Sequence, residues 1–146
     1  MARRSEIKGM RELEKTLKTL ERLPQKCVTK AARKGGTIAL RAAKKNAPVD
    51  SGNLKKGLVL KGERAKIKGK KVYQVTLDKS MNDVFVKESS TGNRSYYPAS
   101  QEYGWMDQYG KYTPGFRYMR KSLDDNNEKI EETVVEVLTK EIDKLE

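Results

Sequence analysis

The residues of this sequence that could take part in catalysis lie in one short corner. Asp50, Ser51 and Asn53 follow Pro48, and a serine beside a carboxylate could act as a nucleophile. A nucleophilic serine needs a base to take its proton, and the chain contains no histidine. The favoured interpretation is a turn in which Asp50 or Ser51 caps backbone N–H groups and Gly52 supplies an unusual dihedral angle. We therefore expect Pro48, Asp50 and Gly52 to be architectural.

Metal and redox chemistry has little support elsewhere in the sequence. Cys27 is the only cysteine, which excludes an internal disulfide, and the lack of histidine removes the commonest metal ligand and general base. No glycine-rich loop that could hold a phosphate follows a predicted strand. The sequence therefore predicts a protein that is not an enzyme and that binds no cofactor or metal ion.

Basic side chains on a predicted helix, at about 25–46, form a second candidate site. Most of them recur at separations near three, four and seven, so they share one side of that helix. The candidates are Lys30, Lys34, Arg41, Lys44 and Lys45. They could touch the phosphates of passing DNA without reading its sequence, pair with an acidic face of an adjacent copy, or simply be solvated.

Aromatic residues crowd a third candidate site, the segment 96–116, where glycines separate them. Tyrosine and tryptophan are favoured at protein interfaces because they combine an apolar body with a polar tip. Tyr97 and Phe116 are the first candidates for core packing. The interface candidates are Trp105, Tyr109, Tyr103, Glu102 and Phe116. Base stacking on single-stranded nucleic acid is an alternative, but the basic half and the aromatic segment are separate in sequence.

The charge of +12 is distributed unevenly along the chain. Residues 1–72 carry 22 Lys and Arg against 6 acids, whereas residues 124–146 carry 3 against 9. This asymmetry predicts either an anionic partner for the first half or packing of unlike charges between copies. A basic, cytosolic nucleic-acid-binding protein is accordingly the alternative function.

The elements that must position these sites follow from apolar periodicity. Ile7, Leu13, Leu17 and Leu20 predict a first amphipathic helix, which Pro24 is expected to end. The inward side of the second helix is unusually small, which predicts a close neighbour; it consists of Val28, Ala31, Ala32, Gly35, Ile38, Ala39 and Ala42. Gly35 and Gly36 cost helix stability, and a packing demand is the favoured reason for them.

The second part of the chain is predicted to contain strands and a final helix. Strands are expected at 58–60, 72–77 and 84–86, with a mobile basic hairpin at 61–71 and an interface loop at 88–116. Apolar residues from Leu123 to Leu145 follow helical spacing. The predicted fold is α+β in one domain, 1–146: two N-terminal helices and a long C-terminal helix packed on a small, mainly antiparallel sheet. No stretch is apolar enough to span a membrane.

The order of these segments resembles the gene-product-ten-like family of tailed phages, described as head–tail connector or tail-completion proteins. The most specific piece is the octapeptide Ala47-Pro48-Val49-Asp50-Ser51-Gly52-Asn53-Leu54 after the small-residue helix. Tyr97 followed by Glu102-Tyr103-Gly104 resembles an aromatic, Glu, aromatic, Gly element of the family. The segment leading into the last helix is also similar, through Pro114, Phe116, Met119, Arg120 and Leu123. Trp105 stands where the family usually has Thr, and Gly115 separates Pro114 from Phe116.

This resemblance implies a structural part of the virion without catalysis, located in the neck or tail and assembled in the host cytoplasm. It implies a ring of identical copies, naturally a hexamer, at the head–tail junction. The implied partners are the phage tail tube or tail terminator and the head-completion proteins, with non-specific contact to passing DNA as an open option.

Overall fold

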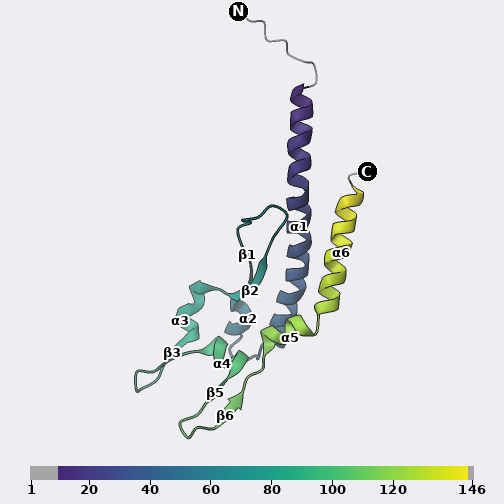
Figure 1. Cartoon of the computed structure of the whole chain (residues 1–146). Helices are drawn as coiled ribbons and strands as arrows, with labels where there is room; N and C mark the ends of the chain where they lie inside the picture. Colours follow the sequence, from purple (N-terminus) through teal and green to yellow (C-terminus); the bar gives the residue numbers. More distant parts are fainter. Residues whose placement is uncertain (1–9, 145–146) are drawn as a thin grey trace, which may run out of the picture.

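A single long helix dominates the chain. The computed structural model describes residues 10–144, in which α1 (Met10–Asn46) is by far the longest element; its first half projects alone, and the remaining elements lie beside its second half or beyond its C-terminal end (Figure 1). At 1.5 Å per residue a helix of this length is about 55 Å long. The predicted helical positions Ile7 and Leu145 lie outside the described residues.

The expected break at Pro24 is wrong, because α1 continues through this residue. A proline inside a helix removes one backbone hydrogen bond and costs roughly 3 kcal/mol. The apolar positions on the two sides of Pro24 are in phase, since Leu20 and Ala31 are separated by about three turns. One continuous helix therefore keeps both sets on one face, so the two predicted N-terminal helices are one.

The α+β class is confirmed, with three small antiparallel sheets instead of one. Each sheet is a separate hairpin: β1 with β2, β3 with β4, and β5 with β6. The strands are β1 (Leu58–Gly62), β2 (Tyr73–Leu77), β3 (Val86–Glu88), β4 (Arg94–Tyr96), β5 (Gly104–Met106) and β6 (Tyr112–Pro114). The shorter helices are α2 (Asn53–Gly57), η1 (Lys79–Met81), α3 (Asn82–Phe85), α4 (Tyr97–Tyr103) and α5 (Tyr118–Asp124).

The C-terminal helix α6 (Asn127–Asp143) lies along the second half of α1 and runs in the opposite direction (Figure 1). It begins later than predicted, because Asp125 and Asn126 separate it from α5. The predicted strand at 84–86 is also only partly correct: Val84 belongs to α3, and the strand begins at Val86.

Two consecutive glycines of α1 allow two elements to approach the helix at the same level. A Cβ atom on Gly35 would lie 3.0 Å from Val134 Cγ2 of α6, and one on Gly36 would lie 2.8 Å from Leu60 Cδ1 of β1. Successive residues point about 100° apart around a helix axis. The predicted close neighbour of the small-residue face is therefore confirmed, and there are two of them.

The core lies where the lower end of α1 meets α2, β1, α3 and α5. Its buried members are Ala43, Ala47, Leu54, Leu58, Phe85 and Tyr118. The corner between α1 and α2 is a turn as predicted, since Gly52 adopts φ 76°. Capping by Asp50 or Ser51 is wrong, because Gly52 is itself the N-cap of α2 and no side chain caps this helix. Pro48 is half-buried and Asp50 is exposed.

Candidate assembly surfaces

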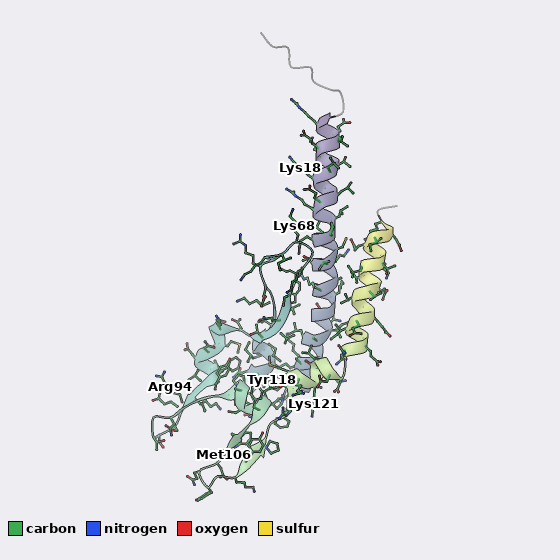
Figure 2. The ribbon with its side chains drawn as sticks, viewed as in Figure 1. Lys18, Lys68, Arg94, Met106, Tyr118 and Lys121 are labelled. Atoms are coloured by element: carbon green, nitrogen blue, oxygen red, sulfur yellow. The ribbon has the colours of Figure 1, made fainter. Side chains whose placement is uncertain are left out.

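The aromatic segment forms a hairpin, β5–β6, that projects from the end of the molecule opposite the start of α1 (Figure 1). Tyr109 is at its tip with 85% of its surface exposed, and Met106 projects from the same hairpin (Figure 2). The large side chains of this region that lie open to solvent are Tyr103, Trp105, Met106, Tyr109, Tyr112 and Phe116. An exposed group of this kind is typical of a contact surface.

The base of the hairpin is held against the body by two glycines and a buried carboxylate. A Cβ on Gly104 would lie 2.2 Å from the Thr113 carbonyl oxygen, and one on Gly115 would lie 2.5 Å from the Glu102 carbonyl oxygen. The backbone N–H groups of Met119 and Arg120 donate to the Glu102 carboxylate at 2.9 and 3.1 Å. Because these donors are the first turn of α5, Glu102 fixes the hairpin base to that helix.

The tip of the hairpin is also ordered by its own side chain. Asp107 Oδ1 accepts hydrogen bonds from the backbone N–H groups of Tyr109 and Lys111, at 2.9 and 2.8 Å. Gly110 takes the left-handed conformation that this turn needs, with φ 79°. The aromatic residues are thus presented on a defined loop.

The predicted aromatic candidates divide between core and surface. Tyr103, Trp105 and Tyr109 are exposed, whereas Glu102 is buried and serves the hairpin base. Phe116 is 52% exposed, so its expected place in the core is wrong, and Tyr97 packs against the core as expected. Gly115, which precedes Phe116, lies directly against the α4 backbone because it has no side chain. The chain turns there, and Phe116 points outward.

Tyr118 is the core aromatic that sequence reasoning missed. It is fully buried, and its hydroxyl donates to the Pro98 carbonyl oxygen at 3.3 Å. Burial, with a smaller contribution from the Glu102 charge, raises the pKa of this hydroxyl well above its usual range. The sequence feature that points to Tyr118 is helical spacing. Tyr118 and Ser122 lie one turn apart on the inward side of α5, and both are buried.

The first half of α1 carries an uncovered apolar stripe. Leu13, Leu17 and Leu20 are each slightly over half exposed, at 53%, 51% and 52%. They continue the face that meets α6 further along, because Gly35 is in phase with Leu17. The helix projects beyond the end of α6 at this level (Figure 1). The stripe therefore has no cover from the described part of the chain.

The basic stripe on the second half of α1 is only partly neutralised. Lys30 forms an ion pair with Glu141 of α6, which raises the pKa of Lys30 through a hydrogen bond and lowers the pKa of Glu141. Lys34, Arg41 and Lys45 are exposed and form no ion pair with any described residue, and Lys44 lies on a neighbouring face, half-buried. The structure brings these predicted residues together on one helix without giving most of them a partner.

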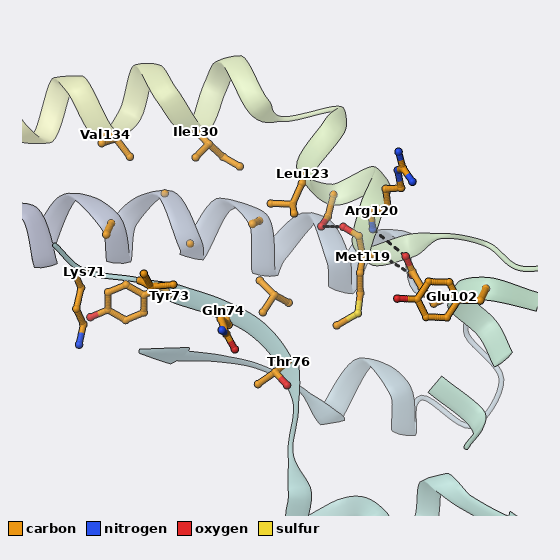
Figure 3. Close-up of a pocket in the computed structure, with 18 residues that line it drawn as sticks. Lys71, Tyr73, Gln74, Thr76, Glu102, Met119, Arg120, Leu123, Ile130 and Val134 are labelled. Atoms are coloured by element: carbon orange, nitrogen blue, oxygen red, sulfur yellow. Dashed lines mark hydrogen bonds between the residues drawn. The ribbon is translucent and has the colours of Figure 1, made fainter. Parts of the chain in front are cut away.

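An apolar groove of about 790 Å³ runs beside α1 between α6 and β2 (Figure 3). Ala32 and Ala39 lie on its floor beside the two glycines, and its walls are mainly apolar. The wall residues include Tyr73, Val75, Leu123, Ile130 and Val134. Gly35 and Gly36, which also line the groove, are the residues that α6 and the β1–β2 hairpin approach closely, so the groove is a product of that packing.

The basic hairpin 61–71 is fastened to α1, contrary to the expectation of a free tip. The Gln25 side-chain amide donates to the Lys70 carbonyl oxygen at 3.2 Å, and its oxygen accepts from the Gly69 N–H at 2.8 Å. Lys68 accordingly lies beside the helix (Figure 2). This attachment is at the level where α1 leaves the body of the molecule.

Between residues 10 and 144, no group of three or more histidine, cysteine or acidic side chains could hold a metal ion. No helix in that part of the chain has the length and apolar content needed to cross a bilayer. The surface features that stand out in this part of the chain are the exposed aromatics on an ordered hairpin and the uncovered apolar half of α1.

The chain belongs to the HK97 gp10-like family of phage tail proteins. The family model described as "Bacteriophage HK97-gp10, putative tail-component" matches residues 11–100, from the start of α1 into α4. Neither the curated proteins nor the solved structures contain a match. The resemblance found in the sequence is therefore confirmed. At the level of the family, the chain has a structural role in the phage tail and virion, and the family is not one of enzymes.

Proposed function

We propose that the chain is a tail-completion subunit that forms a ring at the head–tail junction. Its family membership supports a structural tail role. The observation that carries the finer proposal is the exposure of apolar side chains on two elements, the first half of α1 and the β5–β6 hairpin. These two elements lie at opposite ends of the subunit (Figure 1). A joining protein needs one surface for each side of the joint.

The aromatic hairpin is the first of these surfaces. Trp105 and Tyr109 are large, exposed and held on a loop whose base and tip are both hydrogen-bonded. A surface that is ordered before binding loses less conformational entropy on association. Aromatic anchors of this kind commonly supply most of the energy of an interface. Tyr103 and Phe116 are further exposed aromatics, next to the base of the hairpin in sequence.

The uncovered half of α1 is the second surface. Leu13, Leu17 and Leu20 recur at the i, i+4 and i+7 positions by which an amphipathic helix enters an apolar groove. In a lone subunit this stripe is exposed to water, so its burial in an assembly would be favourable in free energy. The proposed partners at the two ends are the tail tube or tail terminator protein and the head-completion proteins. The ring itself consists of further copies, as a hexamer.

The proposal is tested by complementing a phage that lacks this gene with plasmid-borne variants. The wild-type chain should restore infectious tailed particles, and the null phage should accumulate separate heads and tails in electron micrographs. Trp105→Ala combined with Tyr109→Ala should reproduce the null result, while Thr91→Ala in the β3–β4 turn serves as the matched exposed-loop control. Complete, joined particles from the null phage would contradict the proposed role.

A role in DNA contact remains the second candidate for the basic stripe. The supporting observation is that Lys34, Arg41 and Lys45 have no acidic partner in the described chain. Phosphate contact of this type weakens steeply with salt, because each contact releases counterions. Binding of the purified chain to duplex DNA across a salt series measures it directly.

A further inference from the structure

We infer that neighbouring copies in the ring meet through the outer edge of α6 and the basic stripe of α1. The outer edge of α6 consists of Glu128, Glu131, Val135, Leu138 and Ile142. In this arrangement Glu131 and Glu128 of one copy lie against Lys34 and Arg41 of the next. The inference rests on the proposed ring and identifies the surface by which its subunits associate.

The outer edge of α6 combines acidic and apolar side chains, of which all but the half-buried Leu138 are exposed. Its members are spaced by three and four residues, so they share one face of the helix. Ile130 and Val134, which contact α1 at Gly35, lie on a different face. Val135 and Ile142 are 62% and 56% exposed although they belong to a helix packed on the body. The helix therefore keeps Val135 and Ile142 available to a second neighbour besides α1.

The two surfaces lie on opposite flanks of the α1–α6 pair. Lys129 lines one shallow pocket together with Arg41 and Lys45, so this side of α6 adjoins the basic stripe. Glu131 follows Lys129 by two residues, which is about 200° around the helix. Glu131 therefore points away from the basic stripe of its own chain. One subunit presents an acidic and apolar edge on one side and a basic edge on the other.

The charges that would pair also lie at the same height along α1. Gly35 contacts Ile130 and Val134, which places Lys34 level with Glu131. Arg41 lines the same pocket as Asp125 and Asn126, which places it near the level of Glu128. Rotation about a ring axis parallel to α1 leaves heights unchanged. The neighbour's glutamates consequently arrive at the level of this copy's basic side chains.

Charge and composition favour another copy as the occupant of this surface. Residues 127–143 contain 6 acidic and 2 basic side chains. Lys34 and Arg41 have no ion pair among the described residues, and neither has Glu128 or Glu131. The aliphatic stem of Lys34 can cover Val135 while its ammonium group reaches a carboxylate. The contact is head-to-tail, so it repeats from copy to copy and can close a ring.

Lys30 does not belong to this contact, although it lies on the same stripe. Its ammonium group already pairs with Glu141 of its own chain, where it helps to hold α6 on α1. Reversal of Lys30 would therefore disturb the fold as well as any interface. Lys34 is the more informative position, because its reversal leaves the internal ion pairs intact.

The first experiment reverses charges in the complementation assay. Lys34→Glu and Glu131→Lys should each lower the infectious titre about tenfold or more, because like charges would face each other at every contact in the ring. Co-expression of the two single variants should restore the titre. In a ring that alternates them, one contact keeps the native pair of Lys34 with Glu131, and the next contact carries the same pair with its two charges exchanged. Lys55→Glu on α2 is the matched surface control and should have no effect.

The second experiment is a disulfide trap in assembled particles. With Cys27→Ala removing the native thiol, Lys34→Cys together with Glu131→Cys should give a ladder of covalent oligomers on oxidation. The largest rung reports the number of copies in the ring. Each single-cysteine chain should remain monomeric under the same conditions.

The outcomes separate this interface from the proposed function and from DNA contact. Joined particles that contain the double-cysteine chain but yield no oligomer would overturn the interface and leave the junction role intact. Loss of titre with Lys34→Glu alone, without rescue by Glu131→Lys, would instead assign the basic stripe to DNA or to another protein. Native mass spectrometry showing folded monomers for all variants excludes misfolding as the cause.

Discussion

The two halves of α1 have the same apolar spacing but different residues at those positions. The second half uses glycine and alanine, and α6 and β1 approach within van der Waals contact of Gly35 and Gly36. The first half uses leucines, which are more than half exposed. Small residues on a helix are useful only if something packs closely against them. Large apolar residues that stay exposed remain available to a partner outside the chain. Along α1, residue size therefore distinguishes contacts within the chain from contacts with a partner.

Among the substitutions on α1, the largest effect is expected from filling the close contact in its second half. Gly35→Leu should lower the free energy of unfolding by about 2 kcal/mol or more, because the added side chain meets Val134 and Ile130. For a chain of this size each kcal/mol lowers the thermal midpoint by roughly 2–4 °C. Arg33→Leu, two residues earlier on an exposed face, is the control. An unchanged midpoint for the Gly35 variant would show that α6 does not rest on this residue.

A smaller effect is expected at the boundary between the two halves. Gln25→Ala should lower the free energy of unfolding by about 1 kcal/mol, because it removes two hydrogen bonds that fasten the basic hairpin to α1. Hydrogen exchange at the Gly69 amide should accelerate in this variant. Gln25→Glu, which keeps the acceptor but not the donor, should lose less. Equal exchange rates in the alanine variant and the parent would contradict this attachment.

The ion pair between Lys30 and Glu141 helps to hold α6 on the second half of α1, and it should make the stability of the chain modestly dependent on pH. The pKa of Glu141 is lowered from its ordinary value of 4.5, so the pair's contribution is present above that pH and is lost as the pH falls through the folded value. The pKa of Lys30 is raised from 10.5, so the contribution is complete below that pH and is lost as the pH rises further. Thermal midpoints of Glu141→Gln and the parent should therefore converge in acid and differ at neutral pH.

The smallest effect on stability is expected in the uncovered half. Leu17→Ala should change the free energy of unfolding by less than about 0.5 kcal/mol, because the side chain is exposed in the lone subunit. Leu54→Ala in the core is the matched comparison and should cost roughly 2–5 kcal/mol. The same Leu17 variant should reduce the yield of joined particles. A large loss of stability would mean that the stripe is covered within the chain.

Sequence reasoning recovered the features that depend on local chemistry. The α+β class, the β1–β2 hairpin, the close approach at Gly35 and the turn at Gly52 all follow from periodicity, residue size or backbone freedom, and the structure confirms them. Of the candidate aromatics, the exposure of Trp105 and Tyr109 also agrees with what an interface requires. Whether they contact a partner remains a prediction.

The features that were missed depend on tertiary contacts. Pro24 reads locally as a break, but the in-phase apolar positions on both sides favour a continuous helix. Glu102 is predicted from the sequence as an interface residue, yet it is buried and its carboxylate accepts hydrogen bonds from the first turn of a helix that begins 16 residues later. Phe116 and Tyr118 are two residues apart and have opposite environments, since only the turn after Gly115 determines which of them faces inward.

The position of Pro24 also has a mechanical consequence. Between Met10 and Pro24 the helix is a lever about 20 Å long, and a proline is where a helix bends most easily. A bend of about 20° there would carry the tip through roughly 7 Å while leaving the packing around Gly35 undisturbed. Each copy could thereby adjust its reach independently of its neighbours. A ring of such subunits would combine a rigid body with projecting helices that bend. It could therefore bind a surface whose spacing differs from its own.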